Sequence, residues 1–206
     1  MMARWLYSLV LYLLMPLILL HLWRRGKKAP AYRQRWSERF GKVGAAKIRP
    51  GGIVFHCASV GEVVATTPLI KQVQQQYPDT PVLVTCNTPT GTEQIKRAFG
   101  DSVQHVYLPM DFPHAVSRFL SRVKPKLLCI VETELWPNLF SHSQARGIPV
   151  MVINARLSEK SMQGYQKIAP VTRVIMKGIS QLAAHDAQDA ERFIQLGFFL
   201  NDTATT

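Results

Sequence analysis

Cysteine, acidic side chains and nucleotide-binding loops are scarce in this 206-residue sequence, and each scarcity excludes a class of function. The three cysteines, Cys57, Cys86 and Cys129, are isolated in apolar runs, so the spacing of a zinc site or a redox pair is missing. We expect them to be small buried hydrophobes in a reducing compartment. The histidines form no pair at ligand spacing, and His56 alternates within an apolar run as a packed residue does. There is neither a Walker loop nor a G-x-G-x-x-G motif, and nothing predicts a metal or other cofactor.

Acidic residues number 13 against 25 Lys and Arg, for a net charge of +12, but the excess is local. Residues 51–206 hold 14 basic and 12 acidic side chains, a net of only +2. Residues 24–49 carry one acid, Glu38, and ten bases, hence +9. The ten are Arg24, Arg25, Lys27, Lys28, Arg33, Arg35, Arg39, Lys42, Lys47 and Arg49. A basic surface spread across a nucleic-acid-binding domain is therefore not the pattern here, and we expect no nucleic-acid partner.

The basic segment follows a hydrophobic run, Trp5 to Trp23, that contains no charged residue. Nineteen helical residues span roughly 28 Å, close to the hydrocarbon thickness of a bilayer. Trp5 and Trp23 stand at its ends as interfacial anchors do, and the positive-inside rule places the rest of the chain in the cytoplasm. A cleaved signal peptide would instead have its positive charges before the run and small residues after it. The sequence predicts a membrane anchor over residues 1–23 and a basic juxtamembrane segment over 24–49.

Two questions about the anchor stay open at this point. Pro16 and His21 allow a helix that lies in the membrane interface as well as one that spans the bilayer. The basic residues either bind anionic lipid, at about 1 kcal/mol each, or only set the topology, and both can hold. Tyr32 and Trp36, placed between the arginines, favour an interfacial helix.

Residues 50–197 alternate short apolar runs with amphipathic stretches, which predicts βαβ units and a parallel sheet. The expected strands are 53–58, 81–86, 103–108, 127–131, 149–153 and 181–184. The expected helices are 62–77, 91–99, 112–122, 137–146, 161–177 and 186–196, the second of them opened by a capping box from Thr90 to Glu93. In the doubly wound order the first and fourth strands are neighbours, and the ligand crevice lies at their carboxyl ends.

The first strand ends in A-S-V-G-E, residues 58–62. Ser59 can cap the following helix, Gly61 lets a ligand approach the backbone, and Glu62 lies in the first turn. Two roles are open for Glu62: a general base, or a carboxylate that only complements the helix N-terminus.

The fourth strand leads into E-T-E-L-W-P-N, residues 132–138. We expect Glu132 to lie low in the crevice as a second functional carboxylate, and Glu134 to bond within the loop. Arg156, after the fifth strand, borders the same crevice and either binds a phosphate or carboxylate of a ligand or pairs with a nearby Glu.

Six motifs in order resemble one family from about residue 5 to Gly197. They are the basic run Arg25 to Trp36, A-S-V-G-E, T-P-T-G at 88–91, H-V-Y-L-P-M-D at 105–111, E-T-E-L-W-P-N, and N-A-R-L-S at 154–158. The family is the 3-deoxy-D-manno-octulosonic acid (Kdo) transferases of lipopolysaccharide synthesis in Gram-negative bacteria. The resemblance implies a GT-B fold whose N-terminal, Rossmann-like domain handles the acceptor. It also implies transfer of Kdo from CMP-Kdo to the lipid A precursor, lipid IVA, at the cytoplasmic face of the inner membrane.

In the mechanism that the resemblance implies, Glu62 takes the proton of the attacking sugar hydroxyl and CMP leaves in a single, inverting displacement. Glu132 is then the second essential carboxylate, which stabilises positive charge or positions the acceptor. For contacts with the anionic acceptor, the basic segment offers Arg33, Arg35 and Arg39. Anionic inner-membrane lipids are the expected partners of the anchor.

The tail, residues 198–206, departs from the family pattern, which continues into a second domain with a lysine for the donor. We therefore expect a truncated chain that lacks the C-terminal donor domain and does not transfer Kdo alone. The alternatives are a non-catalytic, membrane-bound fragment that binds the lipid acceptor, and a GT-B enzyme with another nucleotide-sugar donor; the motif series argues against the latter.

Overall fold

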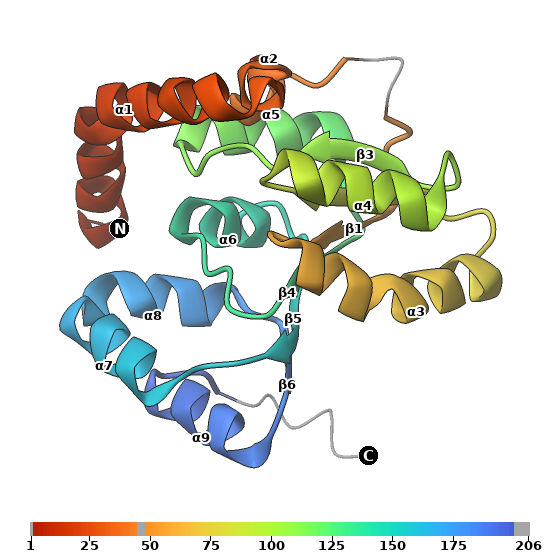
Figure 1. Ribbon diagram of the computed structural model, residues 1–206. Coiled ribbons are helices and arrows are strands. Elements are labelled where there is room, and N and C mark those ends of the chain that lie inside the picture. The colour runs from red at the N-terminus through yellow and green to blue at the C-terminus, as the bar shows by residue number, and fades with distance from the viewer. Residues whose placement is uncertain (1, 45–47, 200–206) are drawn as a thin grey trace.

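The computed structural model describes residues 2–44 and 48–199, and its centre is a six-stranded parallel sheet in the order β3-β2-β1-β4-β5-β6 (Figure 1). The strands are β1 Ile53–His56, β2 Val82–Cys86, β3 Gln104–Tyr107, β4 Leu127–Val131, β5 Val150–Ala155 and β6 Gln181–Ala184. All six predicted strands are present, and β1 and β4 are neighbours as predicted. Val54 is in register with Leu83 on one side and with Leu128 on the other.

Helices cover both faces of the sheet, so the central strands are buried on both sides. Helices α3 Val60–Gln76 and α4 Pro89–Phe99 pack on one face, over a core that includes Phe55 and Val84. The other face packs against α5 Pro113–Val123, α6 Pro137–Gln144, α7 Glu159–Lys167, α8 Ala169–Gly178 and α9 Ala187–Gln195. This arrangement is the α/β, doubly wound architecture that the sequence predicted.

Two local predictions were wrong, each because of a proline. The single helix expected over 161–177 is two helices, α7 and α8, separated at Ile168, because Pro170 lacks the N–H that a continuous helix needs there. Helix α4 begins at Pro89, two residues before its expected start, so the expected capping box does not cap it. Its cap is Thr88, whose side chain accepts from the Gly91 N–H, and Pro89 fits the first helical position, where no N–H is needed.

The N-terminal segment forms α1, Met2–Lys28, followed by a short 3₁₀ helix η1, Pro30–Arg33, and α2, Trp36–Arg39. Helix α1 continues past the expected end of the anchor at residue 23, and it bends along its length with Pro16 in its interior (Figure 1). By length and composition it is the one helix of the described chain that could cross a bilayer. Lys47 of the basic segment and residues 200–206 of the expected tail lie outside the described residues.

Candidate active site

Glu62 is placed by the turn that joins β1 to α3. Ser59 is the helix cap: its Oγ accepts from the Glu62 N–H at 3.2 Å. The Glu62 carboxylate folds back and accepts from the Ala58 N–H at 2.7 Å through Oε2. This is the reciprocal arrangement of a capping box, shifted by one residue. The side chain is only 6% exposed, so a buried carboxylate lies at the carboxyl end of the first strand.

Burial raises the pKa of Glu62 above its ordinary value of 4.5, and the hydrogen bonds from Ser59 and Ala58 offset part of that rise. The negative charge of Glu132 raises it further. Segments 70 residues apart therefore bring two carboxylates together at the point where β1 and β4 are adjacent. A raised pKa brings a glutamate closer to the working pH, which is what proton abstraction requires.

Glu132 directly follows β4 and its backbone lies in the left-handed region, with φ at 59°. A non-glycine residue there costs of order 1–3 kcal/mol, and such positions cluster at functional sites. The Glu132 N–H donates to the Ile153 carbonyl oxygen at 2.9 Å, which ties the turn to β5.

Glu134 belongs to the same group of carboxylates. Burial raises its pKa, and the charges of Glu62 and Glu132 add to the rise. Its Oε2 accepts from the Trp136 indole N–H at 2.9 Å, so it bonds within the loop as expected. The carboxylate group thus contains three members, Glu62, Glu132 and Glu134.

Open space surrounds the turn on the α3 side. A Cβ on Gly61 would meet nothing closer than Ser59 Oγ at 3.8 Å, so packing within the protein does not require glycine there. A cavity of about 380 Å³ lies further along α3, lined by residues of α3 and of the end of β5: Ala65, Thr66, Leu69, Ile153, Asn154 and Arg156. Arg156 is exposed and forms no ion pair within the described residues, and its guanidinium lies 3.5 Å from His185 Nδ1. Its carbonyl oxygen accepts from Thr133 Oγ1.

The three arginines expected to bind the acceptor lie in different environments. Arg33 is exposed and stacks over Trp23 at 5.0 Å. Arg35 pairs with Glu38 at 2.7 Å and donates to the His105 carbonyl oxygen, which attaches α2 to β3. Arg39 is only 4% exposed and stacks on Tyr107 at 4.3 Å.

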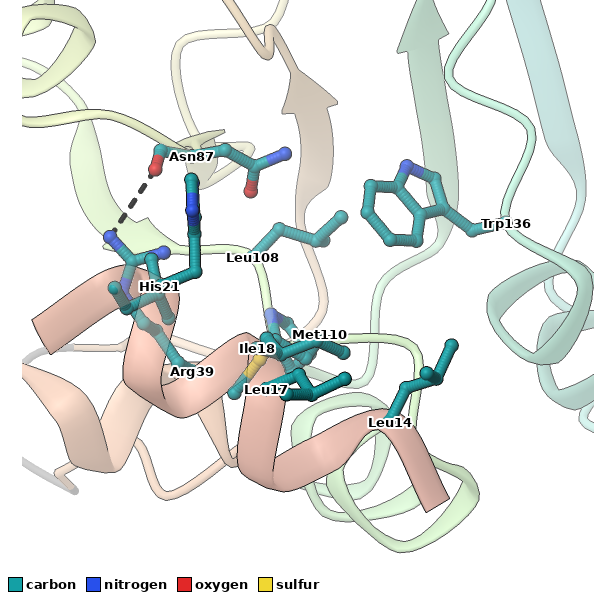
Figure 2. Close-up of a pocket in the computed structure, with 11 residues that line it drawn as sticks. Leu14, Leu17, Ile18, His21, Arg39, Asn87, Leu108, Met110 and Trp136 are labelled. Carbon is teal, nitrogen blue, oxygen red and sulfur yellow. Dashed lines mark hydrogen bonds between the residues drawn. The ribbon is translucent and has the colours of Figure 1, made fainter. Parts of the chain in front are cut away.

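Arg39 also lines a cavity of about 430 Å³ between α1 and the carboxyl ends of the strands (Figure 2). Leu14, Leu17, Ile18 and Leu22 of α1 line one side, and Leu108, Met110 and Trp136 line the other. Arg39 donates to the Asn87 carbonyl oxygen at 3.2 Å, and its Nε has no hydrogen-bond partner. Burial lowers the pKa of this guanidinium. The cavity is therefore mostly apolar, with Arg39 as a buried cation and with His21 and Asn87 on its wall. Trp136 lines it and donates to Glu134.

Sequence reasoning missed a buried polar group beside this site. Asp111, the last residue of H-V-Y-L-P-M-D, accepts from the backbone N–H groups of Asn138 and Leu139 at 2.8 Å each. Asn138 is the last residue of E-T-E-L-W-P-N, so the ends of two motifs meet. The signal available in the sequence was that each of the two motifs ends in a polar residue, Asp111 or Asn138, that has no other role.

The other titratable residues within the strands are packed rather than reactive. His56 is fully buried with Nδ1 3.0 Å from Thr85 Oγ1, and burial lowers its pKa to about 4, so it is neutral at pH 7. All three cysteines are free and buried, and burial raises the pKa of Cys57 and Cys129 to about 12. No group of His, Cys, Asp and Glu within the described residues is arranged to hold a metal ion.

Comparison with known proteins adds a family relationship to this geometry. Residues 34–206 match the family model described as 3-deoxy-D-manno-octulosonic-acid transferase (kdotransferase). A 3-deoxy-D-manno-octulosonic acid transferase of Haemophilus influenzae is 46% identical over 198 residues, which cover 96% of this chain and 46% of the relative.

Two further relatives show the same proportions. The 3-deoxy-D-manno-octulosonic acid transferase of Bordetella pertussis is 34% identical over 204 residues, which are 95% of this chain and 47% of the relative. A probable mitochondrial 3-deoxy-D-manno-octulosonic acid transferase of Arabidopsis thaliana is 35% identical over 192 residues, 91% of this chain and 42% of the relative. The chain spans about half the length of these curated relatives.

Proposed function

The chain belongs to the family of 3-deoxy-D-manno-octulosonic acid (Kdo) transferases, and we propose that it supplies the acceptor side of Kdo transfer from CMP-Kdo to the lipid A precursor. The observation that carries the proposal is the buried Glu62, whose raised pKa and position beside Glu132, at the carboxyl end of β1, suit a base. Glu62 can complete the helix cap and also act as a base, because a carboxylate has about four lone-pair sites and the bonds from Ser59 and Ala58 do not use all of them.

In the reaction that we propose, the Glu62 carboxylate removes the proton of a sugar hydroxyl on the lipid. The hydroxyl oxygen forms a bond to the anomeric carbon of Kdo while the bond from that carbon to the phosphate oxygen of CMP breaks. The electron pair leaves with CMP, and the anomeric carbon is inverted in one displacement. General base catalysis of this kind contributes typically 10²–10⁴-fold.

Glu132 and Glu134 have different proposed roles. Glu132 places a negative charge beside Glu62, where it favours the positive charge that develops on the sugar ring or holds the acceptor. Glu134 is committed to Trp136 and acts on the shape of the loop. Ser59 and Gly61 leave backbone accessible at the turn, and Arg156 offers a cation on the α3 side of the crevice.

For the acceptor we propose the apolar cavity between α1 and the carboxyl ends of the strands. Its leucines suit an acyl chain and Arg39 suits an acidic group on the same molecule. Arg33 is placed to meet a phosphate at the surface, whereas Arg35 is already paired with Glu38 and acts by holding α2 in position. This arrangement fits an enzyme attached to the cytoplasmic face of the inner membrane.

The first experiment is transfer of Kdo from CMP-Kdo to the lipid A precursor in detergent. It compares the 206-residue chain with a version extended by the C-terminal half of the Haemophilus influenzae relative, where we expect the donor to bind. We expect transfer in the extended version. Lipid binding without transfer in either version would favour a non-catalytic acceptor-binding role.

In the active version, Glu62→Gln is the decisive variant because an amide keeps the oxygen that accepts from the Ala58 N–H and loses the base. We expect the rate to fall by about 10²–10⁴-fold with little change in stability. The matched control is Glu93→Gln on the exposed face of α4, which makes the same chemical change away from the crevice. A Glu62→Gln variant as fast as this control would overturn the proposed role of Glu62.

A further inference from the structure

Polar contacts hold the N-terminal half of α1 on the domain. Ser8 is only 4% exposed, and its Oγ lies 3.2 Å from Asn138 Oδ1 and 3.1 Å from Asn138 Nδ2. Arg4 Nη1 lies 3.4 Å from the same Oδ1 and 3.3 Å from His142 Nε2. We call Arg4, Ser8, Asn138 and Asp111 the polar clamp.

The polar clamp is fixed to the domain core through Asn138, which is fully buried. The Asn138 side chain donates to the Asp111 carbonyl oxygen at 2.6 Å, and its backbone N–H donates to Asp111 Oδ2 at 2.8 Å. Pulling α1 away would leave Asn138 without its partner on α1. A buried polar group left unsatisfied costs about 1–3 kcal/mol, so the docked position of α1 is favoured.

The rest of α1 is attached partly to the same domain and partly to η1. Near its middle, the Tyr12 ring lies 5.1 Å from Phe112, and its hydroxyl is 2.5 Å from His114 Nδ1. Near its C-terminus, the Arg25 guanidinium stacks on Tyr32 at 4.3 Å and donates to the Tyr32 hydroxyl at 2.6 Å. Gly26 is buried, and a Cβ there would lie 2.4 Å from Arg33 Cγ, so the backbone of α1 touches the segment that follows it.

These contacts are incompatible with a helix that crosses a bilayer. A spanning helix has its two ends on opposite sides of about 30 Å of hydrocarbon. Here residues 4, 8 and 12 contact the domain of residues 50–197, and residue 25 contacts η1, which is attached to β3 through Arg35. The bend of α1 lets it follow the surface of the domain (Figure 1). A crossing would require the whole N-terminal half to leave the polar clamp.

The outward side of α1 is apolar and bordered by cations. Trp5, Leu9 and Leu13 are all between 55% and 70% exposed. At the C-terminal end, Lys27 Nζ and Arg33 lie over the Trp23 ring at 4.8 and 5.0 Å. An apolar helical surface flanked by aromatic and basic residues binds in the plane of an anionic bilayer surface.

We propose that α1 lies in the interface of an anionic lipid bilayer, held to its own domain by the polar clamp, and does not cross the membrane. Both ends of α1 are then on the side of the bilayer that the domain occupies. The proposal does not rest on the transferase function. The uncharged run Trp5–Trp23 leaves open whether the helix spans the bilayer or lies in its interface, because the run has no charged face. The contacts of Arg4 and Ser8 with the domain decide which side of the helix faces the protein.

The test uses the full chain, expressed in Gram-negative cells and extended at its amino end by a neutral Gly/Ser tag with one cysteine. A membrane-impermeant maleimide is applied to spheroplasts and to inverted membrane vesicles. The native cysteines are buried, so the tag and a control, Glu93→Cys on the domain surface, are the reactive positions. We expect both positions to react from the same side; reaction of the tag from the opposite side would overturn the proposal.

A second measurement tests whether α1 is docked on the domain in the membrane. Ser8→Cys is combined with Asn138→Cys, and after oxidation the pair is probed with a maleimide polymer that increases the apparent mass of free thiols. We expect this pair to be protected, whereas the control pair Ser8→Cys with Glu93→Cys stays reactive. Equal reactivity of the two pairs would show that α1 is not docked in the membrane and would overturn the proposal.

Discussion

At the scale of the residue, Glu62 combines two roles that the sequence left as alternatives. Its Oε2 completes the cap at the start of α3, and its burial raises the pKa that a base needs. A single carboxylate can do both because it has about four lone-pair sites, and the bonds from Ser59 and Ala58 leave one of them for a proton. The functional prediction for Glu62 therefore does not compete with its structural role.

The raised pKa of Glu62 predicts the acidic side of the pH profile. A base works only when deprotonated, so transfer should rise with pH through a pKa above the ordinary 4.5. Glu132→Gln removes a like charge, so it should move this limb to lower pH. The measurement is kcat/KM against pH for both proteins, and an unmoved limb would contradict the assignment of the limb to Glu62.

The contribution of Glu62 to the free energy of unfolding should fall as pH rises, over the same pH range in which transfer activity rises. Because the folded-state pKa of Glu62 is raised, its protonated form is the one that the fold prefers. The stabilisation by protonated Glu62 is complete below the ordinary pKa of 4.5 and is lost as pH rises through the raised pKa of the folded state. Stability and activity therefore oppose each other there, which is the pattern expected of a carboxylate held for its chemistry.

At the scale of the element, the packing of α6 on α8 positions the loop that carries Glu132. A Cβ at Gly178 of α8 would lie 2.8 Å from Phe140 Cβ of α6, so the two helices approach at a glycine. We expect Gly178→Ala to lower the free energy of unfolding by about 1–3 kcal/mol, because the helices must move apart.

The matched control is Gly164→Ala in α7, where a Cβ would meet nothing within 4 Å. The same substitution there should stabilise by about 0.5–1 kcal/mol, since alanine loses less backbone entropy in a helix. Urea unfolding of both variants measures the difference. Equal changes would mean that the close approach of α6 and α8 does not limit stability.

At the scale of the whole molecule, charge is concentrated beside α1 and nearly balanced elsewhere. Residues 24–49 carry a net +9, and residues 51–206 carry +2. This asymmetry predicts which cations attach the protein to anionic membranes.

Arg24→Gln with Lys27→Gln should weaken binding to vesicles that contain phosphatidylglycerol by about 30-fold, at roughly 1 kcal/mol per charge. Lys71→Gln with Lys96→Gln makes the same change of net charge on α3 and α4 and should have little effect. Vesicle co-sedimentation at two salt concentrations measures both. An equal loss in the two double variants would assign the attraction to net charge instead of to the basic segment.

The sequence by itself determined the six strands, their parallel sheet and the neighbouring positions of Glu62 and Glu132. It could do so because strands buried on both faces are short continuous apolar runs, and because the doubly wound order brings the ends of the first and fourth strands together. Helix ends were less accurate where prolines at 89 and 170 decided them.

Only the tertiary structure decided how α1 lies, which arginine is buried, and what Asp111 and Asn138 do. Residues 4, 8, 111 and 138 meet in one buried polar group, and no periodicity in a sequence encodes contacts between segments more than 100 residues apart. Arg35 and Arg39 are four residues apart, yet one forms an ion pair and the other lines a cavity, because Glu38 and Tyr107 surround them differently. Such differences arise from packing, since burial and the positions of partners set the energy of each polar group.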